Sequence, residues 1–289
     1  MTEKIKPENQ NLETMAVKAN LNKLEREYFD KLKAELLQIL NGKTLEDIER
    51  TQDLVLARKA SKKMAEILEF LKSKDIKDEE MKEKSYEELL EWARDDLRKE
   101  NAEEWLEQIF DLDSLPRVKV KGGELNLSKT KVSYLPKNLE VESLIMVYTR
   151  NLITLPYGMK LKELYAAYSE ISTLAGVEVT KVLGIVGNKI IRRLPSGMKL
   201  EELYAAESEL STLEGVEVTK ILQIRDNQNI KRLPSEMKLD YLYALESGLE
   251  DLPDDLIVSE RLNVRGCSER VKQKARELTE RGQIGKLGL

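Results

Sequence analysis

Residues 163–200 read ELYAAYSEISTLAGVEVTKVLGIVGNKIIRRLPSGMKL, and residues 202–239 repeat them as ELYAAESELSTLEGVEVTKILQIRDNQNIKRLPSEMKL. Each copy contains two shorter units, and each unit starts with a leucine that we expect at the beginning of a strand. These leucines are Leu125, Leu144, Leu164, Leu183, Leu203, Leu222, Leu242 and Leu262. Their spacing alternates between about 19 and about 20 residues, and a fixed period of this size is typical of a solenoid.

The unit has alternating apolar residues that predict one buried and one exposed side for each strand. Successive side chains of a strand point to opposite faces, so Leu183 and Ile185 are expected inside while Gly184 and Val186 face solvent. One unit cannot bury its apolar side alone. We therefore expect the units to stack into a single elongated core.

A small polar residue recurs at the turn that follows each predicted strand. The positions are Thr130, Thr149, Ser169, Asn188, Ser208, Asn227, Ser247 and Cys267. Where the chain bends away from the sheet, buried backbone groups lose their ladder partners, and a short side chain can satisfy them. We interpret this column as structural and not catalytic.

The pattern resembles leucine-rich repeat proteins, in particular the bacterial short-repeat type whose units close on Leu-Pro. The closing pairs are Leu115-Pro116, Leu135-Pro136, Leu155-Pro156, Leu194-Pro195, Leu233-Pro234 and Leu252-Pro253. The resemblance covers about residues 115–267. It implies a right-handed solenoid with a parallel sheet on its concave side, used to bind other macromolecules, usually proteins. Ala175 and Glu214 stand where proline is expected, which predicts two alternating turn conformations.

The composition excludes several kinds of active site. The chain of 289 residues has no histidine and one cysteine. Catalysis by a Ser-His-Asp or Cys-His arrangement, histidine-based metal sites and a Cys-x-x-Cys cluster are therefore impossible. We expect a protein that is not an enzyme, with no catalytic residue, no metal and no cofactor.

Charge and hydropathy limit the partners and the cellular location that we expect for the protein. Residues 1–112 carry 21 basic and 28 acidic residues, which disfavours nucleic acid because such a partner needs a concentrated basic face. The first ten residues, MTEKIKPENQ, lack the apolar core of a signal peptide, and no long apolar run follows. We expect no membrane contact, and a cytoplasmic location or export without an ordinary signal peptide.

The fold class predicted is α/β, with three parts. Residues 1–112 form an acidic all-α bundle of about three helices, residues 113–267 a leucine-rich repeat solenoid of about eight rungs, and residues 268–289 a capping helix and tail. An apolar stripe predicts the first helix, and its residues are Leu12, Met15, Ala19, Leu24, Tyr28, Leu32, Leu36 and Leu40. A second helix starts near Thr44 and a third at Ser85, joined by a flexible, highly charged connection over residues 72–84.

Both ends of an open solenoid expose core and strand edge and need a cover. At the front we expect Trp105, Leu106, Ile109 and Phe110 to pack over the first rung. At the back we expect a helix that begins at Ser268 and ends before Gly282. The helical half either acts only as a stable acidic domain and cap or adds a second binding surface or dimer contact.

The outward positions of the strands give the candidate binding site. Tyrosines on alternate rungs offer large rigid area and a hydroxyl, which suits an interface. The alternative is that tyrosine merely suits a solvent-facing strand and was copied by duplication. The candidate partner-binding residues are Tyr148, Tyr165, Tyr168, Gly184, Tyr204, Glu207, Gln223, Arg225, Asp226, Tyr243 and Glu246. Gly184 is expected to leave an open slot between Tyr165 and Tyr204.

The inward column also alternates in size. Ala166, Ala205 and Ala244 lie between larger residues, and Met159, Met198 and Met237 follow the same long period. We interpret the methionines as filling the space beside the alanines. A cofactor pocket in that space is the alternative.

Three functions are weighed. The first is a non-enzymatic interaction module that grips a protein of unknown identity through the concave sheet. The second is an effector-like or scaffold protein that self-associates through its helical domain, and the sequence does not fix an oligomeric state. The third comes from the resemblance, because some bacterial effectors with such repeats carry a C-terminal ubiquitin ligase with a cysteine nucleophile. Too few residues follow Cys267 for that domain, so ligase activity is disfavoured.

Overall fold

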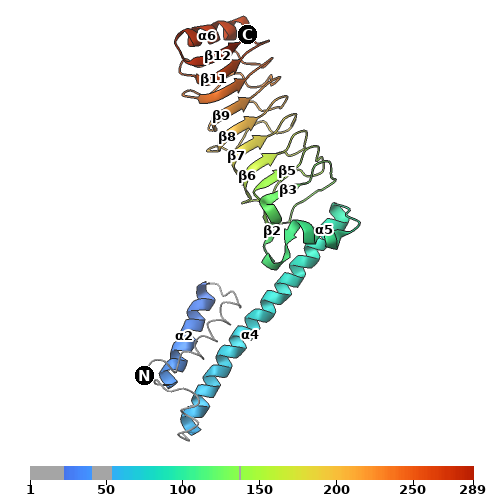
Figure 1. Ribbon diagram of the computed structural model, residues 1–289, viewed down its shortest axis with the longest axis vertical. Coiled ribbons are helices and arrows are strands. Elements are labelled where there is room, and N and C mark those ends of the chain that lie inside the picture. Colours follow the sequence, from blue (N-terminus) through green and yellow to red (C-terminus); the bar gives the residue numbers. More distant parts are fainter. Residues whose placement is uncertain (1–22, 41–53, 137) are drawn as a thin grey trace. The chain divides into compact units, whose positions relative to one another are not determined.

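The computed structural model describes residues 23–40, 54–136 and 138–289. The chain forms two compact units, Met1–Ser85 and Tyr86–Leu289 (Figure 1). The solenoid unit therefore begins at Tyr86 and not at residue 113, because the segment before the first repeat shares the hydrophobic core of the repeats.

The described part of the first unit pairs helix α2 (Lys23–Leu40) with the first half of helix α4 (Leu54–Glu91). Buried residues from both helices form one cluster, made of Phe29, Leu32, Leu36, Leu40, Ala60, Ile67 and Leu71. The predicted apolar stripe is confirmed at Leu32, Leu36 and Leu40, whereas Tyr28 is exposed and Phe29 is buried in its place. Leu12, Met15, Ala19, Thr44 and the side chain of Leu24 lie outside the described residues.

The prediction of a flexible connection over residues 72–84 was wrong, because helix α4 runs through it without a break. The same helix includes Ser85, so no separate third helix begins there. The segment has no glycine or proline, and its lysines and glutamates are good helix formers even where few apolar residues stabilise them. High charge alone therefore did not indicate a loop here.

The front cap consists of a π-helical turn η1 (Trp92–Asp96), helix α5 (Ala102–Ile109) and strand β1 (Phe110–Asp111). Leu106 and Phe110 are buried in the solenoid core, with Trp105 and Ile109 packed against it, which confirms the predicted cover. Trp92 is buried with them, and its Nε1 donates a hydrogen bond of 2.9 Å to the carbonyl oxygen of Tyr134. The cap is thus fixed to the repeats by both packing and hydrogen bonding.

Two short 3-10 turns, η2 (Leu112–Ser114) and η3 (Lys121–Gly123), join the cap to the repeats. Between them lies strand β2 (Val118–Val120), which pairs antiparallel with β1 and parallel with β4 (Leu139–Glu140). This small sheet places the antiparallel β1 along the free edge of β2. One exposed strand edge at the front of the solenoid is covered in this way.

A second sheet of nine strands runs the length of the solenoid, with neighbours in chain order (Figure 1). Its strands are β3 (Glu124–Asn126), β5 (Ser143–Ile145), β6 (Lys160–Tyr165), β7 (Glu178–Gly184), β8 (Lys199–Tyr204), β9 (Glu217–Gln223), β10 (Lys238–Tyr243), β11 (Ile257–Asn263) and β12 (Ile284–Gly288). All the neighbouring pairs are parallel.

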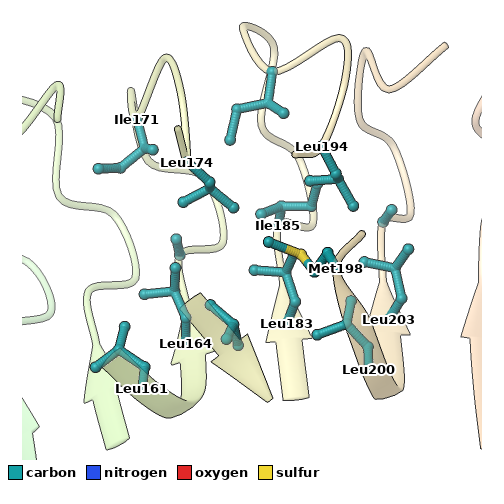
Figure 2. Close-up of a cluster of buried hydrophobic side chains, with 14 of the residues drawn as sticks. Leu161, Leu164, Ile171, Leu174, Leu183, Ile185, Leu194, Met198, Leu200 and Leu203 are labelled. Atoms are coloured by element: carbon teal, nitrogen blue, oxygen red, sulfur yellow. The ribbon is translucent and has the colours of Figure 1, made fainter. Parts of the chain in front are cut away.

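The eight leucines expected at strand starts lie side by side in one register, from Leu125 opposite Leu144 to Leu242 opposite Leu262. They are buried, and they stack into one continuous core with the inward residues of the turns (Figure 2). The result is a parallel-strand β-solenoid of about seven turns.

The turns that precede the strands have the same form, but they begin at different distances from the preceding strand leucine in alternate units. Met159 N donates to Pro156 O with Gly158 at φ 81°, and Val177 N donates to Leu174 O with Gly176 at φ 76°. Both are four-residue turns whose third residue is left-handed. In the units with Ala175 and Glu214 the turn begins two residues earlier after the strand leucine, and one of these residues is regained before the next leucine, which makes the units 19 and not 20 residues long. The prediction of two alternating turn conformations was therefore wrong.

The small polar column pairs buried backbone groups as expected. Asn188 is fully buried; its Nδ2 donates to Ser169 O (3.1 Å) and Ile171 O (2.9 Å), and its Oδ1 accepts from Ile190 N (2.9 Å) and Ile191 N (2.8 Å). Asn227 accepts equivalent bonds and donates to Ser208 Oγ and Leu210 O. Each asparagine therefore joins two successive turns, and the serines between them each donate a single bond to a nearby carbonyl oxygen.

The rear cap is helix α6 (Glu269–Glu280), whose first turn is capped by Ser268 through a hydrogen bond from Val271 N. Val271, Ala275 and Leu278 are buried, as predicted. The residues beyond Gly282 were described from the sequence only as a tail, and no strand was predicted there. Residues 284–288 form β12, which pairs with β11 and sets Leu287 opposite Leu262 as a further member of the leucine row.

The alanines of the inward column are fully buried, and Met159, Met198 and Met237 are buried with them in the same core. Figure 2 places Met198 among Leu183, Ile185 and Leu200. We expect Ala205→Leu to lower the free energy of unfolding by about 1–3 kcal/mol, because a larger side chain must displace packed neighbours. Chemical denaturation checks this value. An unchanged stability would reveal an unfilled space beside Ala205.

In the residues that the structure describes, no helix has the length and apolar character needed to cross a membrane.

Candidate functional site

The predicted tyrosine column lies on the outward face of the nine-stranded sheet, the side opposite the leucine row. Pairing sets Tyr165 opposite Gly184, Gly184 opposite Tyr204, and Gln223 opposite both Tyr204 and Tyr243. The tyrosines therefore occupy alternate strands of one column. Neighbouring strands lie about 4.8 Å apart, so the backbones of successive tyrosines in the column lie about 10 Å from each other.

The tyrosine side chains are half-buried and are held by the residue two positions earlier on the same strand. Tyr204 Oη donates to Glu202 Oε2 at 2.7 Å, and Tyr165 Oη donates to Glu163 Oε2 at 3.4 Å. Burial raises the pKa of both phenols, and the adjacent carboxylates raise it further. Tyr243 has no glutamate at that place and stacks on Tyr241, with ring centroids 6.1 Å apart. The phenols of Tyr165 and Tyr204 therefore stay protonated at neutral pH, and each donates its one O–H to the neighbouring glutamate.

Gly184 does not leave an open slot, so that prediction was wrong. The glycine is buried, and a Cβ built on it would lie 3.4 Å from Cδ1 of Tyr165. Gly187 is covered more closely, because its Cβ would lie 2.3 Å from the ring of Tyr168. The tyrosines of strand β6 and its following turn thus lean onto the glycines of the next rung. Only the contact at Gly187 requires a glycine, because a Cβ at Gly184 would make an ordinary van der Waals contact with Tyr165.

The second part of the predicted site lies where the strands end. Tyr148, Tyr168, Glu207, Asp226 and Glu246 occupy equivalent turn positions, and all have φ between 51° and 58°. A left-handed backbone costs a residue with a side chain about 1 kcal/mol. The rings of Tyr148 and Tyr168 stack with centroids 5.0 Å apart and planes at 8°, which offsets part of that cost.

The charged members of the site lie toward the C-terminal rungs. Arg225 Nε contacts Asp226 Oδ2 at 2.7 Å, and this carboxylate raises the pKa of the guanidinium. Glu207 lies near Tyr168 and raises the pKa of its phenol. The middle of the face, from strand β5 to strand β8, carries uncharged residues in the tyrosine column and in the column two positions later, and these are Ile145, Val147, Tyr165, Ala167, Gly184, Val186, Tyr204 and Ala206.

One column of the outward face was missing from the predicted site. It lies two positions before the tyrosine column and contains Ser143, Glu163, Val182, Glu202, Ile221 and Tyr241. The alternation that placed Tyr165 outside also places Glu163 outside, so the signal was present in the sequence. The contact of tyrosine hydroxyls with the glutamates makes this column part of the same surface.

Two hollows occur elsewhere, at the edge where the strands begin. One, of about 680 Å³, includes Lys119, Gly123 and Met159; the other, of about 1120 Å³, includes Gly197, Glu217 and Met237. Neither includes any predicted binding residue, so the candidate site is a surface and not one of these hollows.

Cys267 continues the small polar column. It is buried, and its Sγ donates to Ala244 O at 2.9 Å while lying 3.5 Å from Ser247 Oγ. The thiol thus donates to a carbonyl oxygen of the preceding rung, as Thr149 does to Leu127 O, whereas Ser169 and Ser208 donate within their own rungs.

The fold defines a parallel-strand solenoid between a helical front segment and a final helix, with a tyrosine-bearing face. Comparison with family models, with curated proteins and with solved structures found no match for this chain.

Proposed function

We propose that this chain is a leucine-rich repeat protein that binds a protein partner, without catalysis, on the outward face of its solenoid sheet. The single observation that carries the proposal is the register that sets Tyr165, Tyr204 and Tyr243 on alternate strands of one face. The leucine spacing and the Leu-Pro closures support the repeat type.

The physical properties of this face favour protein recognition. Its half-buried tyrosines are already ordered by carboxylates, by stacking or by glycine contacts, so binding orders few further side chains. Aromatic residues with a hydroxyl combine apolar area with hydrogen-bonding capacity, which is typical of residues that dominate binding energy. Because Cys267 is buried in the turn column, the proposal includes no thiol chemistry.

We expect Tyr165→Ala and Tyr204→Ala each to weaken partner binding at least about tenfold, because each removes a large contact from the middle of the surface. Affinity capture from the source cell with the wild-type chain identifies the partner. Titration calorimetry with that purified partner then gives the affinity of each variant.

Tyr157→Ala is the matched control, because Tyr157 is 91% exposed and lies before strand β6, away from this face. Circular dichroism confirms that each variant is folded. Unchanged affinity in both Tyr165→Ala and Tyr204→Ala would contradict the proposed function.

A further inference from the structure

The carboxylates around the outward face differ from those at the edge where the strands begin. At that edge, lysines bridge neighbouring rungs: Lys160 pairs with Glu178 at 3.4 Å and Lys199 with Glu217 at 3.2 Å. Lys162 with Glu142 and Lys220 with Glu201 do the same at 2.5 Å. Negative charge at this edge is therefore neutralised within the solenoid itself.

Glu163 and Glu202 on the outward face have no such partner. Within the described part of the chain, no lysine or arginine nitrogen forms an ion pair with either carboxylate. Each instead accepts a hydrogen bond from the tyrosine two positions later, and Glu163 also accepts one from Ser143 Oγ at 3.3 Å. These bonds fix the carboxylates beside the tyrosine rings without an ion pair, and Lys220, which pairs with Glu201, interacts with Glu202 only through its field.

We propose that the partner of this face is a peptide segment that carries two basic side chains flanked by apolar ones, an inference that rests on the proposed function. The basic groups would pair with Glu163 and Glu202 and lie against the rings of Tyr165 and Tyr204, where a cation also gains from the aromatic faces. The apolar residues would cover the uncharged middle of the face. Charge complementarity selects this class of segment over an acidic or a wholly apolar one.

The geometry also sets the spacing of the two basic residues. Glu163 and Glu202 occupy equivalent positions on β6 and β8, with Val182 of β7 between them. Their backbones are thus about 10 Å apart, twice the distance between neighbouring strands. Residues i and i+7 of an α-helix are separated by about 10.5 Å. A helix crossing the strands would match both carboxylates at that spacing, and a segment in the polyproline II conformation, which has three residues per turn, would match them at i and i+3.

The test uses the full chain and a displayed library of random peptides selected on it. The strongest enriched peptide is synthesised with a fluorophore, and its affinity is measured by anisotropy at low and high ionic strength. Two double variants are compared with the wild type: Glu163→Gln with Glu202→Gln, and the matched control Glu178→Gln with Glu217→Gln. The control removes two carboxylates of the same sheet that already have lysine partners.

We expect the enriched peptides to contain an excess of lysine and arginine at the predicted spacing. The outward-face double variant should bind the peptide about tenfold more weakly, with less dependence on salt, while the control binds as the wild type does. Enrichment without basic residues, or equal binding by the two double variants, overturns the inference.

The tyrosine variants separate the failure of this inference from the failure of the proposed function. Binding that is lost in Tyr165→Ala and Tyr204→Ala but retained in the outward-face glutamine variant contradicts the basic partner alone. A library that yields no peptide dependent on those tyrosines contradicts both.

Discussion

Replacing Asn188 with alanine is expected to lower the free energy of unfolding by about 3–5 kcal/mol. The fully buried amide makes four hydrogen bonds that join two successive turns. Alanine would leave the N–H groups of Ile190 and Ile191 without that acceptor, and the bond to Ile191 N is buried. Denaturation followed by far-ultraviolet circular dichroism measures the loss.

Ser169→Ala is the matched control for this prediction, because Ser169 occupies the equivalent turn one rung earlier and donates a single hydrogen bond of 2.8 Å to Ala166 O. We expect that variant to lose only about 1 kcal/mol. A further variant, Asn188→Ser, introduces the residue of the neighbouring rungs and should fall between the two. If Asn188→Ala cost no more than Ser169→Ala, the bridging role of the asparagine would be wrong.

The repeat could be predicted from the sequence because its signal is periodic and its period is set by sterics. The eight strand leucines, from Leu125 to Leu262, lie in the expected register, since an apolar residue shifted by one position would point to solvent. Leu287 was missed because the last strand follows a helix and has no Leu-Pro closure. Whether a segment pairs at the end of a sheet depends on the unpaired backbone groups of the neighbouring strand. A local sequence pattern does not show these groups.

The helical half was harder to predict for a different reason. A charged stretch without apolar periodicity fits either a solvated helix or a loop, so residues 72–84 gave no decisive signal. The buried position of Phe29 in place of Tyr28 is a shift of one residue on a helix face. Such a shift depends on the partner helix, which the stripe alone does not place.

For the candidate site, strand alternation predicted which residues face outward but not how their side chains lie. The tyrosine column and the omitted Glu163 and Glu202 column follow the same rule of alternation. The covering of Gly184 by Tyr165, and of Gly187 by Tyr168, depends on rotamers and on the left-handed backbone at Tyr168. Contacts of that kind depend on the geometry of neighbouring rungs and become visible only in three dimensions.

The front cap gives the second large expected effect, and two truncations isolate it. A chain starting at Tyr86 retains the whole solenoid unit and is expected to stay monomeric and folded. A chain starting at Asp113 loses Trp92, Leu106 and Phe110, each of which is at most 1% exposed in the solenoid core. Removing three such side chains removes about 6 kcal/mol of the stabilisation that comes from apolar burial. It also uncovers the edge of strand β2.

We therefore expect the shorter chain to aggregate, or to melt at least about 10 °C below the longer one. Light scattering on the purified chains and thermal unfolding by circular dichroism check both outcomes. The hydrogen bonds that the Asp96 carboxylate accepts from the backbone N–H and the hydroxyl of Ser133, at 2.8 and 2.7 Å, are lost with the cap and add to the effect. A monomeric shorter chain with the melting temperature of the longer one would mean that the solenoid needs no cover at its front, and that residues 86–112 serve another purpose.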